Sequence, residues 1–320
     1  MTDASGFGPH LFREDAISEE TRAFNHQIEQ LMRDMPALSS RPPQVTRDER
    51  EAGASVFGPL HLSPMAVERS VPGRAGAVPV RVFVPESVVG VYIHIHGGGW
   101  TLGRAHHQDA RLEQMAGDCN VAVVSVDYRL APEHPYPAGP DDCEDVAVWL
   151  VENAKREFGS ERIVIGGGSA GGHLSAVTLL RLRDRHGYRG FAGANLVYGC
   201  YDLTLTPSAR RWGDRRLVMT TSDIHWFFDQ FVPAERRSDP DVSPLYADLH
   251  SMPPALFTVG TLDSILDDSL FMYTRWVAAG NRAELAVYPG GAHGFDNFPI
   301  TIAREANARM DAFIRACVEA

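Results

Sequence analysis

The stretch Gly167-Gly168-Ser169-Ala170-Gly171 decides the fold of this chain. It follows an apolar run at 162–167 and opens a segment with helical spacing at 170–185. A serine among small residues at a strand-to-helix turn is typical of a nucleophile elbow, where the backbone is strained and packs closely. The helix that begins behind Ser169 also favours negative charge there, because its N-terminus carries a partial positive charge. We therefore predict that Ser169 is a catalytic nucleophile.

The same glycines match a second pattern, Gly166-x-Gly168-x-x-Gly171, which is the fingerprint of a dinucleotide-binding turn. Such a site also needs an acidic residue about 20 positions further on. The first acid after the next predicted strand is Asp202, which lies 202 − 171 = 31 positions beyond Gly171. The serine interpretation is therefore preferred, and no cofactor is expected.

Strand-like and helix-like segments alternate along most of the chain. Apolar, β-rich runs occur at 65–70, 79–84, 91–96, 121–127, 162–167, 194–198, 255–260 and 283–288. Segments with helical spacing occur at 17–34, 108–117, 141–157, 170–185, 221–231, 266–279 and 302–318. This alternation predicts an α/β fold with an eight-stranded, mostly parallel sheet and helices on both faces. The first two runs flank Pro72-Gly73 and are predicted to form an antiparallel hairpin that turns there.

A glycine run, His96-Gly97-Gly98-Gly99-Trp100, follows the third predicted strand. Its glycines allow backbone N–H groups to turn inward, towards a point where an oxyanion can form. Next to an elbow serine, such a run is typical of an oxyanion loop.

A catalytic triad on this fold also needs an acid and a histidine, in the chain order Ser, Asp, His. Asp263 follows the seventh predicted strand, and it lies 263 − 169 = 94 residues after Ser169. His293 lies on a glycine-rich loop after the last predicted strand, 293 − 263 = 30 residues after the acid. Asp267 and Asp268 compete for the role of the acid, but they lie about a turn into the next segment. We therefore predict Ser169, Asp263 and His293 as the catalytic residues.

The elbow and the glycine run, taken together with three further motifs, resemble those of one known family. This is the hormone-sensitive-lipase family of α/β-hydrolases, in its bacterial esterase branch. The motifs are the string YRLAPEHPYPA at 128–138, the string SPLY at 243–246, and Asp-Ser-Ile-Leu-Asp at 263–267, where that family usually has Asp-Pro-Leu. The resemblance spans about 65–295 and implies an α/β-hydrolase fold with a helical cap. It also implies a serine carboxylesterase that acts on small or short-acyl esters, with Gly98, Gly99 and Ala170 as the oxyanion-hole donors.

The interval 201–254 interrupts the alternation and holds one aromatic helix, 221–231. An insertion at the carboxyl end of a strand lies where open α/β sheets bind ligands. Trp100, Trp226 and Phe227 are therefore the expected substrate-binding residues, since they would give a pocket apolar walls. We predict four segments: an N-terminal helical cap segment at 1–50, the first part of the catalytic core at 51–200, a cap insertion at 201–250, and the second part of the core at 251–320.

Gly168 departs from the family, which usually has Asp immediately before the nucleophile. A side chain there would reduce the entropy of the unfolded chain, so we expect Gly168→Asp to stabilise the protein by about 0.4–1 kcal/mol if the local φ and ψ suit a side chain. A positive φ at this position would reverse the effect.

Charge and cysteine content exclude several classes of protein. The chain has 30 Lys and Arg against 41 Asp and Glu, a formal charge of −11, which disfavours binding to nucleic acid or to an anionic membrane. The four cysteines lie far apart, which fits neither a zinc site nor a disulfide framework and suits a reducing compartment. His94 and His96 share one face of a strand, but no third ligand joins them, so no metal is expected.

Residues 1–20 show no basic stretch followed by an apolar run, and no apolar stretch reaches the roughly 18 residues that a membrane helix needs. We therefore expect a cytoplasmic enzyme whose partner is a small-molecule ester, and a homodimer stays open. An amidase, lactonase or acyltransferase would use the same triad, and these alternatives also stay open. A non-enzymatic ligand-binding homologue would be expected to have lost a triad member, which this chain has not.

Overall fold

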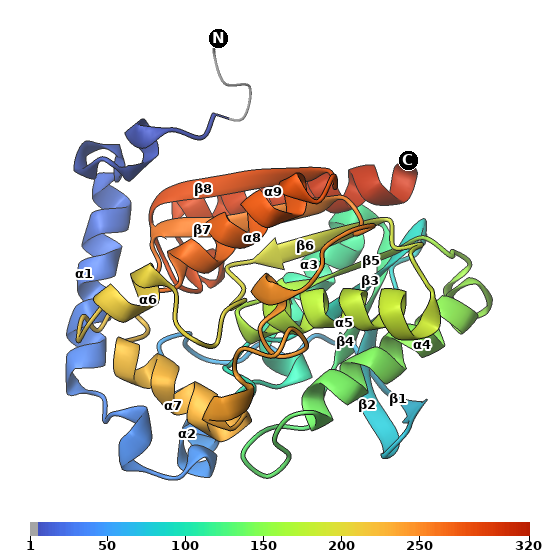
Figure 1. Cartoon of the computed structure of the whole chain (residues 1–320), viewed down its shortest axis with the longest axis horizontal. Coiled ribbons are helices and arrows are strands. Elements are labelled where there is room, and N and C mark those ends of the chain that lie inside the picture. The colour runs from blue at the N-terminus through green and yellow to red at the C-terminus, as the bar shows by residue number, and fades with distance from the viewer. Residues whose placement is uncertain (1–5) are drawn as a thin grey trace.

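A computed structural model describes residues 6–320, so the first five residues of the predicted cap segment 1–50 lie outside it. The described residues form one eight-stranded sheet with helices on both of its faces (Figure 1). The strands are β1 (Val67–Gly73), β2 (Gly76–Phe83), β3 (Gly90–Ile95), β4 (Val121–Val126), β5 (Ile163–Gly168), β6 (Gly193–Val197), β7 (Ala255–Leu262) and β8 (Ala283–Ala292). The helices are α1 (Glu19–Asp34), α2 (Pro43–Glu51), α3 (Asp109–Cys119), α4 (Ala138–Phe158), α5 (Ala170–His186), α6 (Pro207–Arg211), α7 (Thr221–Phe231), α8 (Leu266–Ala278) and α9 (Thr301–Glu319).

The strands lie in the order β1-β2-β4-β3-β5-β6-β7-β8. β2 is antiparallel to both of its neighbours, and from β4 to β8 every pairing is parallel. Every residue of β3, β4 and β6 is buried, because helices cover both faces of a parallel sheet. This explains why each of these strands is apolar except for one residue, His94, Ser125 and Asn195 respectively. The predicted eight-stranded, mostly parallel sheet is therefore confirmed.

Alternate residues of the central strands enter two different apolar cores. Ile93 of β3 joins the core that contains α4, α5 and α8, whereas its neighbour Tyr92 joins the core that contains α3 and α9. This alternation is the period of two that places successive side chains on opposite faces of a strand. The sheet is thus the middle layer of three.

The last two strands run further than the sequence predicts. The prediction ends them at Gly260 and Tyr288, because the glycines at 290–291 read as a loop. In the structure β7 and β8 continue past a bulge, and Leu262 pairs with Ala292. Asp263 and His293 therefore follow directly on paired residues, at the carboxyl end of the sheet.

The predicted hairpin turn at Pro72-Gly73 is wrong. Both residues belong to β1, where Gly73 pairs with Gly76, so the chain turns at residues 74–75. The strand pairing itself is antiparallel, as predicted.

Helix α2 was not predicted from the sequence. The segment contains several prolines, but Pro43 occupies the first turn of the helix, where its missing N–H leaves no hydrogen bond unmade. No residue of α2 is fully buried, so the helix shows no apolar stripe that a periodicity search could detect. The short helix α6 lies within the insertion and was missed as well.

The N-terminal helices and the insertion 201–250 pack together beside the sheet (Figure 1). Ile28 of α1 joins one apolar cluster with Leu217 of the insertion, and Glu29 pairs with Arg215 at 2.7 Å. The helix predicted at 221–231 is confirmed as α7, and a capping box between Thr220 and Asp223 fixes its start. Within residues 6–320, no helix has the length and apolar character needed to cross a membrane.

The turn between β5 and α5 holds Ser169 at φ 59° and ψ −122°, a strained conformation for a residue with a side chain. Gly168, just before it, has no left-handed φ. However, a Cβ at position 168 would lie 3.0 Å from Cε2 of Tyr198 and 3.1 Å from its Oη. Tyr198 has little room to move, because it is buried, its hydroxyl donates to Asp296, and its ring packs 4.8 Å from that of His293.

We therefore expect Gly168→Ala and Gly168→Asp to destabilise the protein, which reverses the expectation from the sequence. Crowding a well-packed site typically costs about 1–3 kcal/mol. The matched control is Gly117→Ala in α3, where a Cβ meets nothing within 4 Å and should stabilise the helix by about 1 kcal/mol. Thermal and urea unfolding measure both effects. A rise in Tm for Gly168→Ala would show that the Tyr198 ring moves aside to make room for the Cβ, and would contradict the prediction.

Candidate active site

Ser169 stands at the carboxyl end of the sheet, where β5 turns into α5. Its backbone N–H donates to the carbonyl of Val197 at 2.9 Å, and its own carbonyl accepts the N–H of His173 at 3.1 Å. These bonds tie the elbow to β6 on one side and to α5 on the other. The serine side chain remains half-buried and faces a pocket.

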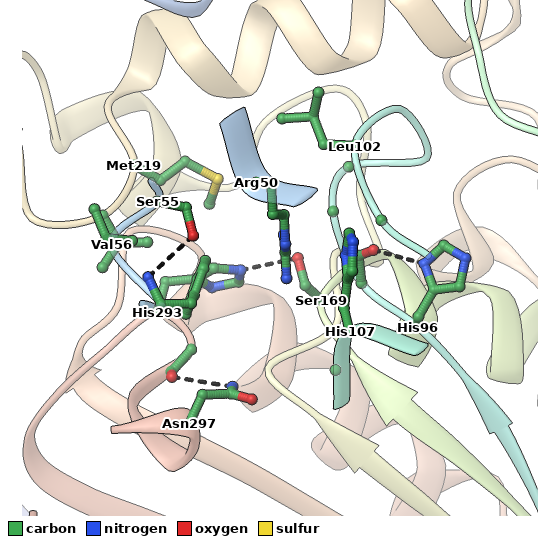
Figure 2. Close-up of a pocket in the computed structure, with 18 of the residues that line it drawn as sticks. Arg50, Ser55, Val56, His96, Leu102, His107, Ser169, Met219, His293 and Asn297 are labelled. Carbon is green, nitrogen blue, oxygen red and sulfur yellow. Dashed lines mark hydrogen bonds between the residues drawn. The ribbon is translucent and has the colours of Figure 1, made fainter. Parts of the chain in front are cut away.

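The three predicted catalytic residues form one chain of hydrogen bonds (Figure 2 shows its first bond). His293 Nε2 lies 2.8 Å from Ser169 Oγ. His293 Nδ1 lies 2.9 Å from Asp263 Oδ2 and 3.1 Å from its Oδ1. Asp263 is 2% exposed and also accepts the N–H of Ile265 at 2.9 Å. The carboxylate can therefore hold the proton of the imidazole on Nδ1, which leaves Nε2 free to accept the serine proton.

The two competing acids have other partners. Asp267 accepts the backbone N–H of Ser208 at 2.8 Å. Asp268 accepts the hydroxyl of Thr206 at 2.7 Å and two further backbone N–H groups of the insertion. Both acids anchor the start of the insertion, and Asp263 alone of the three hydrogen-bonds to His293.

The glycine loop turns its backbone towards the serine. Gly98 has φ 107° and Gly99 has φ 57°, so both adopt conformations that favour glycine. The N–H groups of Thr101 and Leu102 both donate to the carbonyl of Gly98, which closes the loop. Among residues 6–320, no acceptor pairs with the N–H groups of Gly98, Gly99 or Ala170. All three residues line the pocket that contains Ser169, and their N–H groups are free to donate.

Trp100 fixes the end of that loop. Its indole Nε1 donates to His173 Nδ1 at 3.0 Å, and His173 Nε2 donates to the carbonyl of Val242 at 2.7 Å. Burial lowers the pKa of His173 to about 4, so the ring stays neutral and can accept the indole proton. The indole also stacks on Phe231 of α7, with 4.5 Å between ring centroids. The loop and the insertion are therefore held together.

The pocket in front of Ser169 has a volume of about 560 Å³, within the range of small-molecule sites. Trp100 and Phe227 line it, as predicted from the sequence, whereas Trp226 does not. Trp226 is half-buried and packs edge-on against Phe227, with 5.1 Å between ring centroids. Its assignment as a residue of the pocket wall is therefore corrected: it supports Phe227 from outside.

The helical period of α7 explains this correction. The buried apolar residues of α7 have the spacing i, i+3, i+4, i+7, which is one face of a helix; they are Ile224, Phe227, Phe228 and Phe231. Trp226 is off that face. The spacing of the apolar residues in the sequence therefore separates Trp226 from Phe227, whereas their aromatic character does not.

Three further pocket residues were missed. Tyr198 is buried beside His293, and its hydroxyl donates to the half-buried carboxylate of Asp296. Arg50 reaches the pocket from α2. None of them lies in a recognisable motif, and the element that carries Arg50 was itself not predicted.

His94 and His96 serve as structural side chains. His94 is hydrogen-bonded to Ser125 at 2.8 Å and to Gln108 at 2.9 Å, so both of its ring nitrogens are used. The ring of His96 stacks on Tyr128 with 4.1 Å between centroids, and its Nδ1 bonds to the carbonyl of Gly97. Burial lowers the pKa of His94 to about 3 and that of His96 to about 4. Both rings are therefore neutral; His96 supports the glycine loop, and His94 links β3 to Ser125 of β4 and to Gln108.

Comparison with known proteins agrees with this geometry. A family model described as α/β hydrolase fold matches residues 92–297. The chain is 37% identical over 238 residues to the carboxylic ester hydrolase LipN of Mycobacterium tuberculosis, covering 71% of this chain but only 63% of LipN, less than two thirds of its length. It is 35% identical over 283 residues to the carboxylesterase NlhH of the same species, covering 82% of this chain and 86% of NlhH.

Solved structures show the same fold. A hyperthermophilic esterase from the archaeon Pyrobaculum calidifontis superimposes with a TM-score of 0.84 at 31% identity, covering 93% of this chain and 98% of that one. A hormone-sensitive lipase from a metagenome library superimposes with a TM-score of 0.82 at 26% identity, covering 93% and 98%. The chain belongs to the α/β-hydrolase fold family, in its hormone-sensitive-lipase group of carboxylic ester hydrolases.

Proposed function

We propose that this ester hydrolase is a serine carboxylesterase in which Ser169, His293 and Asp263 act as the catalytic triad. The observation that carries the proposal is the 2.8 Å contact between Ser169 Oγ and His293 Nε2, at the floor of the pocket. A nucleophile within hydrogen-bond reach of a base, itself oriented by a buried acid, is the arrangement that covalent catalysis by serine requires.

The reaction then has two halves. Ser169 Oγ attacks the ester carbonyl carbon while His293 Nε2 takes the serine proton, and the carbonyl oxygen becomes an oxyanion. When the carbon–oxygen bond to the alcohol breaks, His293 returns that proton to the leaving alcohol, and an acyl-enzyme remains. Water, deprotonated by His293, attacks the acyl carbon, and the serine leaves with the proton. Asp263 stabilises the imidazolium in both halves without taking its proton.

The oxyanion has three candidate donors, the unpaired N–H groups of Gly98, Gly99 and Ala170. They come from two segments of the chain, the glycine loop and the first residue of α5. Donors fixed in advance, at a site from which water is excluded, stabilise developing charge without reorganisation.

The N-terminal segment and the insertion 201–250 act as a cap that limits the length of the acyl chain. Phe227 supports this role, because its Cδ1 would lie 2.1 Å from a Cβ placed on Gly99, so its ring presses on the glycine loop. With Trp100 it gives the pocket an apolar wall beside the reacting carbonyl. Small or short-acyl esters are therefore the proposed substrates. The four cysteines are free and buried, which supports the cytoplasm as the proposed location.

Removing the nucleophile or the base should abolish turnover. We expect Ser169→Ala and His293→Ala each to lower kcat for 4-nitrophenyl acetate by several orders of magnitude, and the double variant to be little worse, because the two residues act as a unit. A serine-directed phosphonate should label Ser169 alone, as peptide mass spectrometry would show. Near-normal turnover in Ser169→Ala would contradict the triad.

The acid can be tested against its neighbours. Asp263→Asn should lower kcat by about 10⁴-fold, because an amide favours the wrong tautomer of His293. Asp267→Asn is the matched control: its carboxylate holds a backbone N–H of the insertion, so its effect should appear in Tm rather than in kcat. A larger loss of kcat in Asp267→Asn than in Asp263→Asn would refute the assignment.

The cap can be tested with two adjacent aromatics. Phe227→Ala should move the preferred chain length of 4-nitrophenyl esters upward while turnover of the acetate stays within about threefold, since a lid controls access more than chemistry. Trp226→Ala removes a ring that packs on Phe227 from outside the pocket, so it should shift the chain-length profile less than Phe227→Ala does. If Phe227→Ala lowered the turnover of esters of every chain length by the same factor, the Phe227 ring would have only a structural role and the cap proposal would be wrong.

A further inference from the structure

Arg50 brings an unpaired positive charge into the pocket that holds Ser169. It is the next-to-last residue of α2, and Figure 2 shows its side chain pointing from that helix into the pocket, between His293 and His107 in that view. Its Nε is buried without a hydrogen-bond partner. Among residues 6–320 no carboxylate pairs with its guanidinium, whose recorded contact is the ring of Phe57, 5.0 Å away.

The other arginines of the pocket have partners. Three of them form ion pairs: Arg41 with Glu49, Arg104 with Asp127, and Arg111 with Asp311. Arg216 donates to the carbonyl of Arg33 at 3.2 Å. In the described chain, Arg50 thus stands apart from the other arginines of the pocket: it has neither a carboxylate nor a carbonyl as partner.

Arg50 is half-buried as a whole, but its Nε is shielded from solvent without a partner, and leaving a partly desolvated charge unpaired is unfavourable, so this arrangement needs a reason. Burial lowers the pKa of Arg50 to about 10, which still leaves the guanidinium protonated at neutral pH. Its charge also helps to lower the pKa of His107 and of His96, so it acts on the walls next to the glycine loop. A ligand with a negative group would supply the partner that the protein lacks.

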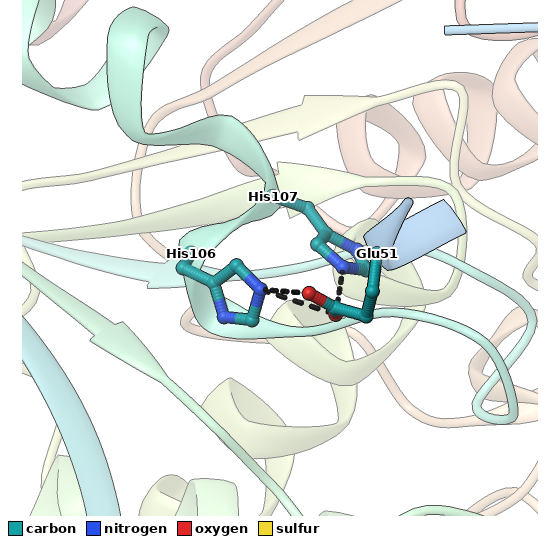
Figure 3. Close-up of side chains that lie close together, drawn as sticks. All are labelled: Glu51, His106 and His107. Atoms are coloured by element: carbon teal, nitrogen blue, oxygen red, sulfur yellow. Dashed lines mark hydrogen bonds and ion pairs between the residues drawn. The ribbon is translucent and has the colours of Figure 1, made fainter. Parts of the chain in front are cut away.

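The helix that carries Arg50 is fixed on both sides of it. Arg47 donates to the carbonyls of Thr101 at 2.7 Å and Ala131 at 2.8 Å, just beyond the glycine loop. Glu51 binds His106 and His107 of the short helix η4 (Ala105–Gln108), with its closest contacts at 2.9 and 2.8 Å (Figure 3). The backbone from which the Arg50 side chain extends is thus held in place before any ligand arrives, and the guanidinium itself rests on the ring of Phe57, which reduces the entropic cost of binding.

Glu51, His106 and His107 could also be read as ligands of a metal ion, since their ligand atoms lie within 4.8 Å of one another. A metal-bound histidine normally donates its other ring N–H to an acceptor. His107 Nδ1 is buried and has no partner, so an N–H there would be left unsatisfied. As a hydrogen-bond donor through Nε2, His107 keeps only a lone pair on Nδ1. The cluster therefore fits an anchor for α2 better than a metal site.

We propose that Arg50 binds a carboxylate of the substrate, and that the preferred esters are half-esters of dicarboxylic acids. A guanidinium and a carboxylate match in shape and form two parallel hydrogen bonds. One unpaired guanidinium balances one negative charge, which suits a carboxylate better than a doubly charged phosphate. This inference rests on the proposed function, because the ester bond must reach Ser169 while the carboxylate reaches Arg50.

The test compares two esters that differ only in charge, monoethyl glutarate and its neutral amide analogue, ethyl glutaramate. In the Ser169→Ala protein, which cannot turn them over, calorimetry should show that the anionic ester binds more tightly. Adding Arg50→Gln should weaken that binding by about 10- to 100-fold, the effect of losing a charge-assisted hydrogen bond, and leave the amide within about threefold. Arg50→Lys should recover part of the preference, since it keeps the charge but not the planar fork.

Turnover provides the second readout and separates the two proposals. With Ser169 intact, Arg50→Gln should lower kcat/KM for monoethyl glutarate and hardly change it for ethyl glutaramate, whereas Arg216→Gln should preserve the ratio of the two. Equal losses on both esters together with a lower Tm would show that Arg50 only stacks on Phe57, and the inference would be wrong. Charge-selective binding without any turnover or labelling of Ser169 would support the carboxylate site and overturn the proposed function instead.

Discussion

The pairing of the last residues of β7 and β8 is the constraint on which the site depends. Leu262 pairs with Ala292 beyond a bulge, so Asp263 and His293 leave the sheet side by side. Ser169 leaves it at the end of β5, two strands away from β7 in the same sheet. Three residues far apart in sequence thus meet because parallel strands end at one edge. A shift of the β7–β8 register by one residue would separate the acid from the base.

The cap is tied to the same edge by a buried acid. Asp268, five residues after Asp263, accepts the N–H groups of Tyr201 and Asp202 and the hydroxyl of Thr206. All of these donors belong to the start of the insertion, so the insertion leaves the core from a fixed point next to the acid loop. A buried carboxylate with three donors is well satisfied and makes this junction rigid.

The sequence was informative where a motif states a chemical requirement. The elbow around Ser169 and the glycine run before Trp100 could be predicted, because few residue types allow those backbone conformations. It was uninformative where polar contacts decide the structure, as in α2, which has no buried residue and docks through the side chains of Arg47 and Glu51. The position of Arg50 in the pocket could not be predicted for the same reason, because the sequence of a charged residue on a polar helix is the same as that of a solvent-exposed one.

The net charge of the whole chain is negative, whereas Arg50 brings a positive charge into the pocket. The distance between a ligand and each of these charges determines which one dominates its electrostatic energy. The formal charge of −11 repels anions in bulk solution, but at physiological salt this field is screened within about 8 Å. Inside the pocket, Asp223 is engaged in the cap of α7 and Asp296 accepts the hydroxyl of Tyr198. A bound anion would therefore respond to Arg50, whose half-buried position weakens the screening of its charge by solvent. Recognition of a negative group at this site is thus compatible with an acidic protein, and it acts through contact rather than through long-range attraction.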